Sequence, residues 1–75
     1  GNENANTLLQ LYPNPAYDKV MVKTTGQGEI QVLDLMGKVV LSYPANGLNE
    51  LSIRNLVTGV YTVRFNGASQ KLVVK

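Results

Sequence analysis

The chain has 75 residues, of which 44% are hydrophobic and 16% charged, and it contains no cysteine and no histidine. This balance predicts one small globular domain that folds without disulfides, and it argues against a disordered tail. The seven lysines and arginines are scattered, so the net charge of +2 gives little support for nucleic-acid binding. No stretch approaches the roughly 20 apolar residues of a membrane-spanning helix, and any export signal is expected upstream of Gly1.

Residues 1–6, "GNENAN", predict a polar linker or a remnant of cloning, followed by a single domain over residues 7–75. Short alternating or apolar runs with turn residues between them then predict an all-β, Ig-like antiparallel sandwich of about seven strands. In these strands Val20 and Val22 share one face, and Tyr61, Val63 and Phe65 share another. The seven expected strands cover residues 8–12, 19–24, 29–35, 38–43, 49–53, 60–66 and 70–74.

Two prolines flank one asparagine directly after the first expected strand. Pro13 and Pro15 fix φ and lack an N–H group, and Pro15 pushes Asn14 into an extended conformation. The segment therefore predicts a stiff corner after Tyr12. A calcium site built on Asn14 and Asp18 is conceivable, but local backbone caps explain these side chains better, so we expect no metal and no cofactor.

Two short turns predict hairpins. In "DLMGK", Asp34 is expected to accept a hydrogen bond from the backbone N–H of Met36 or Gly37, which closes a hairpin between residues 29–33 and 39–43. Asn66 and Gly67 tolerate positive φ and predict a second hairpin, which pairs the last strand with the strand before it.

The segment "NLVTGVY" predicts a connection that begins at Asn55 and ends at Gly59, with Leu56 closing one end of the core. Tyr61 opens the next strand. A buried Tyr61 whose hydroxyl binds a backbone group, similar to a tyrosine corner, explains this residue better than a role in ligand binding.

The last strand, "KLVVK", is expected to place Leu72 and Val74 inward and Lys71, Val73 and Lys75 outward. Two interpretations remain open. A partner could pair with the edge of this strand or grip its terminus, or the lysines could serve only to discourage aggregation at the edge.

Catalysis has few suitable groups in this sequence. The five carboxylates fall on separate segments and no serine has a base partner, so we expect no enzyme activity. The alternative function is that of an Ig-like or fibronectin-like adhesion or carbohydrate-binding module. The lack of tryptophan argues against sugar binding, as does the expectation that only Tyr17 among the tyrosines is exposed.

Four segments together resemble one known family: "LYPNPAYDKVMV", "IQVLDLMGKVV", "LVTGVYTVRF" and "QKLVVK". In this order they are similar to the type A C-terminal sorting domain of type IX secretion, from Bacteroidetes-type bacteria. The resemblance covers residues 8–75. Gln70 departs from it, since a basic residue is common at that position.

The resemblance implies a sorting signal that passes from the periplasm to the cell surface or the medium. The implied partners are the type IX translocon and its shuttle proteins, an N-terminal passenger domain, and a sortase-like signal peptidase that cleaves in or before residues 1–6. No nucleic acid and no transmembrane segment are implied. The motif positions implied in translocon recognition are Pro13, Asn14, Pro15, Asp34, Gly37, Gly59, Tyr61, Lys71, Leu72, Val73, Val74 and Lys75.

Overall fold

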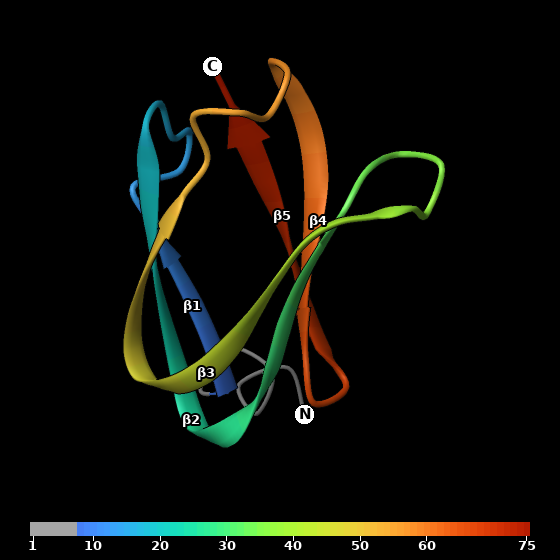
Figure 1. Ribbon diagram of the computed structural model, residues 1–75. Coiled ribbons are helices and arrows are strands. Elements are labelled where there is room, and N and C mark those ends of the chain that lie inside the picture. Colours follow the sequence, from blue (N-terminus) through green and yellow to red (C-terminus); the bar gives the residue numbers. More distant parts are fainter. Residues whose placement is uncertain (1–7) are drawn as a thin grey trace.

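The computed structural model describes residues 8–75, so the predicted linker over residues 1–6 lies outside the described residues. The described chain is all β (Figure 1). Among its residues, no helix is long and apolar enough to cross a membrane. The strands are β1 (Leu9–Tyr12), β2 (Lys19–Leu33), β3 (Val39–Ser52), β4 (Gly59–Phe65) and β5 (Ala68–Val74).

The predicted number of seven strands is wrong, because the structure has five. Predicted strands 19–24 and 29–35 belong to one long strand, β2, and predicted strands 38–43 and 49–53 both fall mainly within β3. The glycines between these segments bend the strands without ending them. β2 and β3 stay paired on both sides of the bend, and the register shifts between Lys23 and Gln27, where β2 carries the extra residues.

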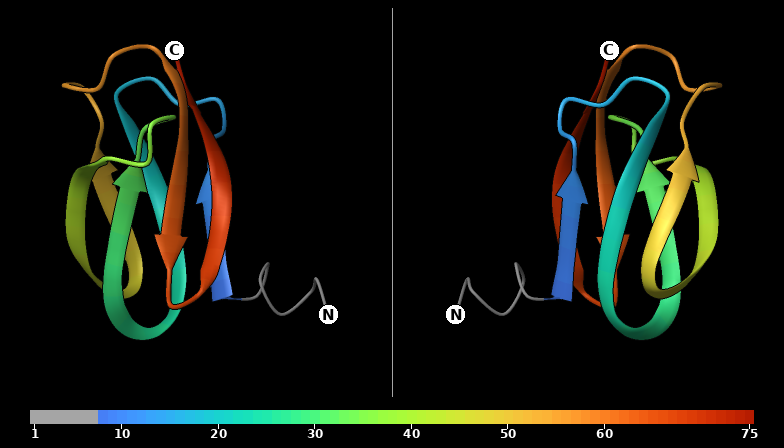
Figure 2. Two further views of the ribbon diagram at one scale, coloured as in Figure 1. Left: turned by 90° about the vertical axis from the view of Figure 1, so that its right-hand side faces the viewer. Right: turned by 90° about the vertical axis from the view of Figure 1, so that its left-hand side faces the viewer.

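The strands form one antiparallel sheet that curls around the core, and a separate two-layer sandwich is not confirmed. β2 keeps β3 on one edge, while its other edge pairs first with β1 and, past the bend, with β4. This change of partner turns the second half of the sheet over the first, as the two side views show (Figure 2). β1 and β5 thereby come into contact, and the side chain of Gln70 donates a hydrogen bond to the backbone oxygen of Leu9.

The core lies inside the curl, and alternation along the strands fills it as predicted. Val20 and Val22 of β2 are fully buried, and along β4 the buried residues Tyr61, Val63 and Phe65 alternate with exposed ones. Burial of such side chains stabilises the fold by about 1.5–3 kcal/mol each. Because the chain has no disulfide, this apolar burial is the main source of stability.

Both predicted hairpins are confirmed. Residues 29–33 pair antiparallel with residues 39–44, and β4 pairs with β5 along its whole length. Asn66 and Gly67 have φ values of 46° and 85°, which are the left-handed conformations that this tight turn requires.

The ends of the elements define two poles of the domain. The corner after β1, the turn between β2 and β3, the connection before β4 and the end of β5 lie toward the upper end in Figures 1 and 2. The bend of β2, the β4–β5 turn and the start of β1 lie toward the lower end.

Candidate recognition surfaces

The proline corner contacts the last strand through the side chain of Asn14. Its Oδ1 accepts a hydrogen bond from the backbone N–H of Val73 at 2.9 Å, and its Nδ2 donates to the backbone oxygen of Lys71 at 2.8 Å. The amide thus offers β5 the acceptor and the donor that a neighbouring strand would offer. The stiff corner predicted at Pro13 and Pro15 holds this side chain against a strand 57 residues away in sequence.

Ala16 continues the same contact through its backbone. Its N–H donates to Val73 O at 2.8 Å, and its oxygen accepts from Lys75 N–H at 2.8 Å, forming a parallel bridge with Val74. The other edge of β5 pairs with β4. Backbone pairing by a partner with Lys71–Lys75 would therefore require displacement of Asn14 and Ala16.

The inward and outward faces predicted for the end of β5 are confirmed. Leu72 and Val74 are buried, Lys71 and Lys75 are exposed, and Val73 is half-buried. The outward face thus carries one ammonium group on each side of Val73, from Lys71 and from Lys75.

The turn between β2 and β3 is built on Asp34. Its Oδ1 accepts hydrogen bonds from Met36 N–H at 2.9 Å and from Lys38 N–H at 3.0 Å, while Gly37 N–H donates to the backbone oxygen of Asp34 at 3.0 Å. The predicted bond from Met36 is confirmed, and Gly37 binds the backbone instead of the carboxylate. Gly37 has a φ of 84°, which favours glycine at this position.

The connection before β4 is fixed by Tyr61, as predicted. The ring is buried and the hydroxyl donates a hydrogen bond to the backbone oxygen of Val57. Leu56 is half-buried against the core, and β4 begins at Gly59.

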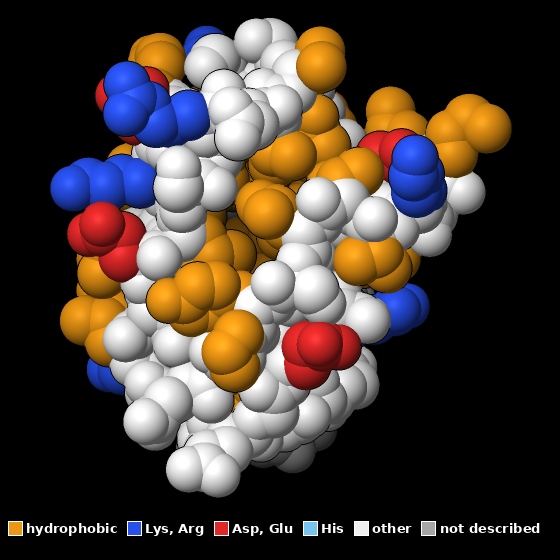
Figure 3. Space-filling model, viewed as in Figure 1, with side chains coloured by type: hydrophobic (Ala, Val, Ile, Leu, Met, Phe, Trp, Pro, Cys, Tyr) orange, Lys and Arg blue, Asp and Glu red, His pale blue; other side chains and the backbone are white. Residues whose placement is uncertain are grey.

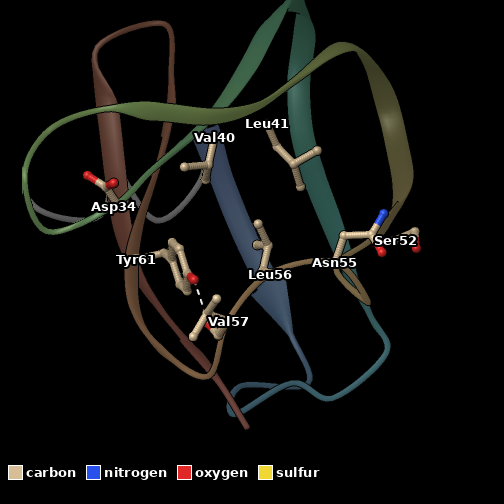
Figure 4. Close-up of a pocket in the computed structure, with 8 residues that line it drawn as sticks. All are labelled: Asp34, Val40, Leu41, Ser52, Asn55, Leu56, Val57 and Tyr61. Atoms are coloured by element: carbon tan, nitrogen blue, oxygen red, sulfur yellow. Dashed lines mark hydrogen bonds between the residues drawn. The ribbon is translucent and has the colours of Figure 1, made fainter.

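A hollow of about 550 Å³ opens between this connection and β3 (Figure 4). Val40 and Leu41 both line it, although consecutive residues of a regular strand point to opposite faces. A register shift explains this, since Val32 pairs with Leu41 while Leu33 pairs with Val39, so β3 carries one extra residue. The other lining residues are Asp34, Ser52, Asn55, Leu56, Val57 and Tyr61.

Exposed apolar side chains surround this hollow. Leu35 is 81% exposed, Met36 91% and Val57 78%, and all three line a second, smaller hollow that shares Asp34, Val57 and Tyr61 with the first. Figure 3 shows hydrophobic side chains along the cleft and at the projecting turn. The sequence did not predict a surface role for Val40, Leu41, Leu35 or Val57, because no period marks either the bulge or the exposed turn.

The remaining site predictions concern metals and aromatic residues. Within residues 8–75, no three carboxylates gather as a metal site, and both polar atoms of Asn14 are engaged by β5. The expectation that only Tyr17 is exposed is wrong, since Tyr12 and Tyr43 are also 47% and 42% exposed. Tyr12 pairs with Met21 and Tyr43 with Ile30, on either side of the bend in β2.

The structure brings the predicted motif residues into two groups near one pole. Asn14 contacts Lys71 and Val73, while Asp34 and Tyr61 line the hollow. Pairing of β4 with β5 connects the two groups, because Gly59 lies opposite Val74.

The chain was compared with models of known protein families. A family model described as a secretion system C-terminal sorting domain matches residues 10–75. The match spans all five strands except the first residue of β1. A search of curated proteins finds no match to the chain.

Proposed function

The chain belongs to the family of secretion-system C-terminal sorting domains, and on that premise we propose that it directs a passenger protein through the type IX outer-membrane translocon. The observation that carries the proposal is the family match over nearly the whole described chain. Membership implies a sorting signal, export to the cell surface or the medium, and an N-terminal passenger.

The geometry supports recognition at the pole that carries the motif residues. There the end of β5, which Asn14 and Ala16 contact, lies close to the hollow beside Tyr61. The pairing of β4 with β5 connects the two. The first described strand starts at the opposite pole, so a passenger attached before β1 would extend away from this surface (Figure 1). Translocon or shuttle proteins would then reach the motif pole without a clash with the passenger.

The proposal includes removal of the domain after export. A sortase-like signal peptidase would cleave in or before residues 1–6, ahead of β1. Because the fold is closed by contacts between β1, the corner and β5, cleavage there would leave the folded domain intact. Transit through the periplasm is part of the same proposal.

The test is export of a fluorescent reporter that carries the 75 residues at its C-terminus, in a type IX-competent bacterium and in a translocon-null strain. We expect the reporter in the medium or on the cell surface only when the translocon is present. Retention of a folded fusion in the periplasm of the competent strain would contradict the sorting function. Glycan binding by the same protein would then favour the adhesion or carbohydrate-binding alternative.

A matched pair of variants tests the pole itself. Leu35→Ser removes an exposed apolar side chain beside the hollow, and Leu48→Ser removes one that is 57% exposed near the bend of β2. Both should leave stability within about 0.5 kcal/mol, because neither side chain is in the core. We expect weaker export for Leu35→Ser alone. Equal export of the two would show that the exposed side chain of Leu35 does not contribute to recognition.

A further inference from the structure

The end of β5 is held on both edges. β4 pairs with one edge, and on the other Asn14 and Ala16 engage Val73 N and O, Lys71 O and Lys75 N. The side chain of Asn14 supplies two of these four contacts, at 2.8 and 2.9 Å. An alanine at this position would supply neither of them.

This arrangement decides which chemical groups a partner can reach. The backbone groups of Lys71, Val73 and Lys75 that face the corner are satisfied, whereas the side chains of these three residues point outward. Alternate residues of a strand stand about 7 Å apart, so the two lysines lie on either side of the valine at a fixed spacing. Such a surface fits a partner with carboxylates around a small apolar site.

We propose that Asn14 is a positioning residue that holds Lys71–Lys75 as a latched strand, and that the export machinery binds the outward side chains of this strand without pairing with its backbone. The inference rests on the proposed sorting function. It differs from recognition by strand addition, which would require the contact with Asn14 and Ala16 to open.

The first experiment compares Asn14→Ala and Asn14→Asp with the unchanged chain in amide hydrogen exchange and in reporter export. Asn14→Ala should speed exchange of the Val73 amide by roughly fivefold or more, while the Val63 amide in β4 keeps its protection. Asn14→Asp keeps an acceptor for Val73 N–H but loses the donor to Lys71 O, so we expect a smaller effect. Export should fall in the same order, by several-fold for alanine.

A second experiment locks the contact. Ala16 and Val74 are bridge partners, and neighbouring strands lie about 4.8 Å apart, within the Cα separation that a disulfide spans. Because the chain has no cysteine of its own, the double variant Ala16→Cys/Val74→Cys can form only this intramolecular bond. The single cysteine variants control for the core substitutions. We expect the oxidised double variant to be exported as well as the single variants.

A third comparison tests the chemistry of the partner. Lys71→Glu and Lys75→Glu should each reduce export several-fold without changing exchange at Val73. Lys23→Glu makes the same charge change at an exposed position on β2 and should leave export unchanged.

Unchanged export of Lys71→Glu and Lys75→Glu would contradict recognition of the outward side chains. If the oxidised double variant is retained while the single variants are exported, the strand must open and the proposal is wrong. Normal export of Asn14→Ala, despite lost protection at Val73, overturns it equally. Failure of the unchanged fusion to be exported in the competent strain instead overturns the proposed function, and this inference with it.

Discussion

At the scale of single residues, three polar side chains take the place of missing backbone partners. Asn14 does so for β5 and Asp34 for its turn, and Asn49 does so where β3 bends. Asn49 is only 7% exposed, donates from Nδ2 to Val22 O and accepts at Oδ1 from Asn46 N–H. An asparagine amide suits this task because it carries a donor and an acceptor together.

Replacement of Asn49 tests this role directly. Asn49→Ala leaves Val22 O and Asn46 N–H without these partners, so we expect a loss of about 1–3 kcal/mol in the free energy of unfolding. Urea denaturation followed by circular dichroism measures it. Asn46→Ala is the matched control, since Asn46 is exposed and takes part in this contact through its backbone. Similar stability of the two variants would contradict the assigned role.

Gly28 is required for a close approach between the bend of β2 and the β4–β5 turn. A Cβ built there would lie 2.9 Å from Cε1 of Phe65, which is fully buried, and 2.7 Å from Oδ1 of Asn66. We expect Gly28→Ala to destabilise the domain by about 1–3 kcal/mol through overpacking. A Cβ at Gly59 would have its nearest neighbour 3.9 Å away, so Gly59→Ala should be nearly neutral when thermal unfolding of the two variants is compared.

The neutral glycine also separates stability from recognition. Gly59 is a motif position at the start of β4, and an alanine there fits the fold. Lost export in a stable Gly59→Ala variant would therefore indicate contact with a partner. Unchanged export would indicate that the glycine has no direct contact role.

At the scale of elements, the sequence predicted where the chain is extended and where it turns, but not how far each strand continues. Periods of two and the Asp34 and Asn66 turn residues are local signals, and both hairpins followed from them. The predicted strands over residues 19–24 and 29–35 left a break between them, yet pairing with β3 on both sides of the bend keeps β2 one strand. A local pattern of residues does not show which segments pair in the tertiary structure.

The candidate surfaces likewise combine features that the sequence predicted with features that it did not. Burial of Tyr61 and the outward face of Lys71–Lys75 were predicted from alternation and turn chemistry. The sequence does not mark the bulge that turns Val40 and Leu41 together into the hollow, because residues 39–41 form a continuous apolar run without alternation. The contact from Asn14 to β5 could not be predicted either, since the two segments lie at opposite ends of the sequence.

One carboxylate, that of Asp34, stabilises the turn between β2 and β3. Asp34→Ala removes the acceptor of Met36 N–H and Lys38 N–H, so we expect the free energy of unfolding to fall by about 1–2 kcal/mol. The melting temperature should fall by roughly 4–8 °C for each kcal/mol lost. Asp34→Asn keeps one side-chain oxygen and should retain most of the stability. Equal melting temperatures for these two variants would show that the side-chain oxygen does not stabilise the turn.

At the scale of the whole molecule, the two ends of the described chain close the curled sheet. Gln70 contacts Leu9, and Asn14 and Ala16 hold the end of β5. The long β2–β3 pairing does not by itself hold β1 or the proline corner in place, and their contacts with β5 help to fix both segments. The last strand is therefore both a part of the core and the centre of the proposed recognition surface.

This double role means that deletion of Lys71–Lys75 should unfold the domain. The deletion removes Leu72 and Val74, which are 0% and 2% exposed, and with them about 1.5–3 kcal/mol of apolar burial each. It also removes the pairing opposite Gly59 and Tyr61 and the contacts of Asn14. Against the 5–15 kcal/mol that stabilises a typical domain, the loss leaves a small chain largely unfolded.

Far-ultraviolet circular dichroism and amide chemical-shift dispersion would measure this loss. The double variant Lys71→Ala/Lys75→Ala is the control, because both side chains are exposed and the buried residues between them remain. We expect the control to unfold cooperatively near the temperature of the unchanged chain, while the shortened chain shows no transition. A cooperative transition in the shortened chain would mean that β1 to β4 fold without the contacts between the proline corner and the end of β5. Export of a shortened fusion would then report on recognition, whereas an unfolded one could report only on folding.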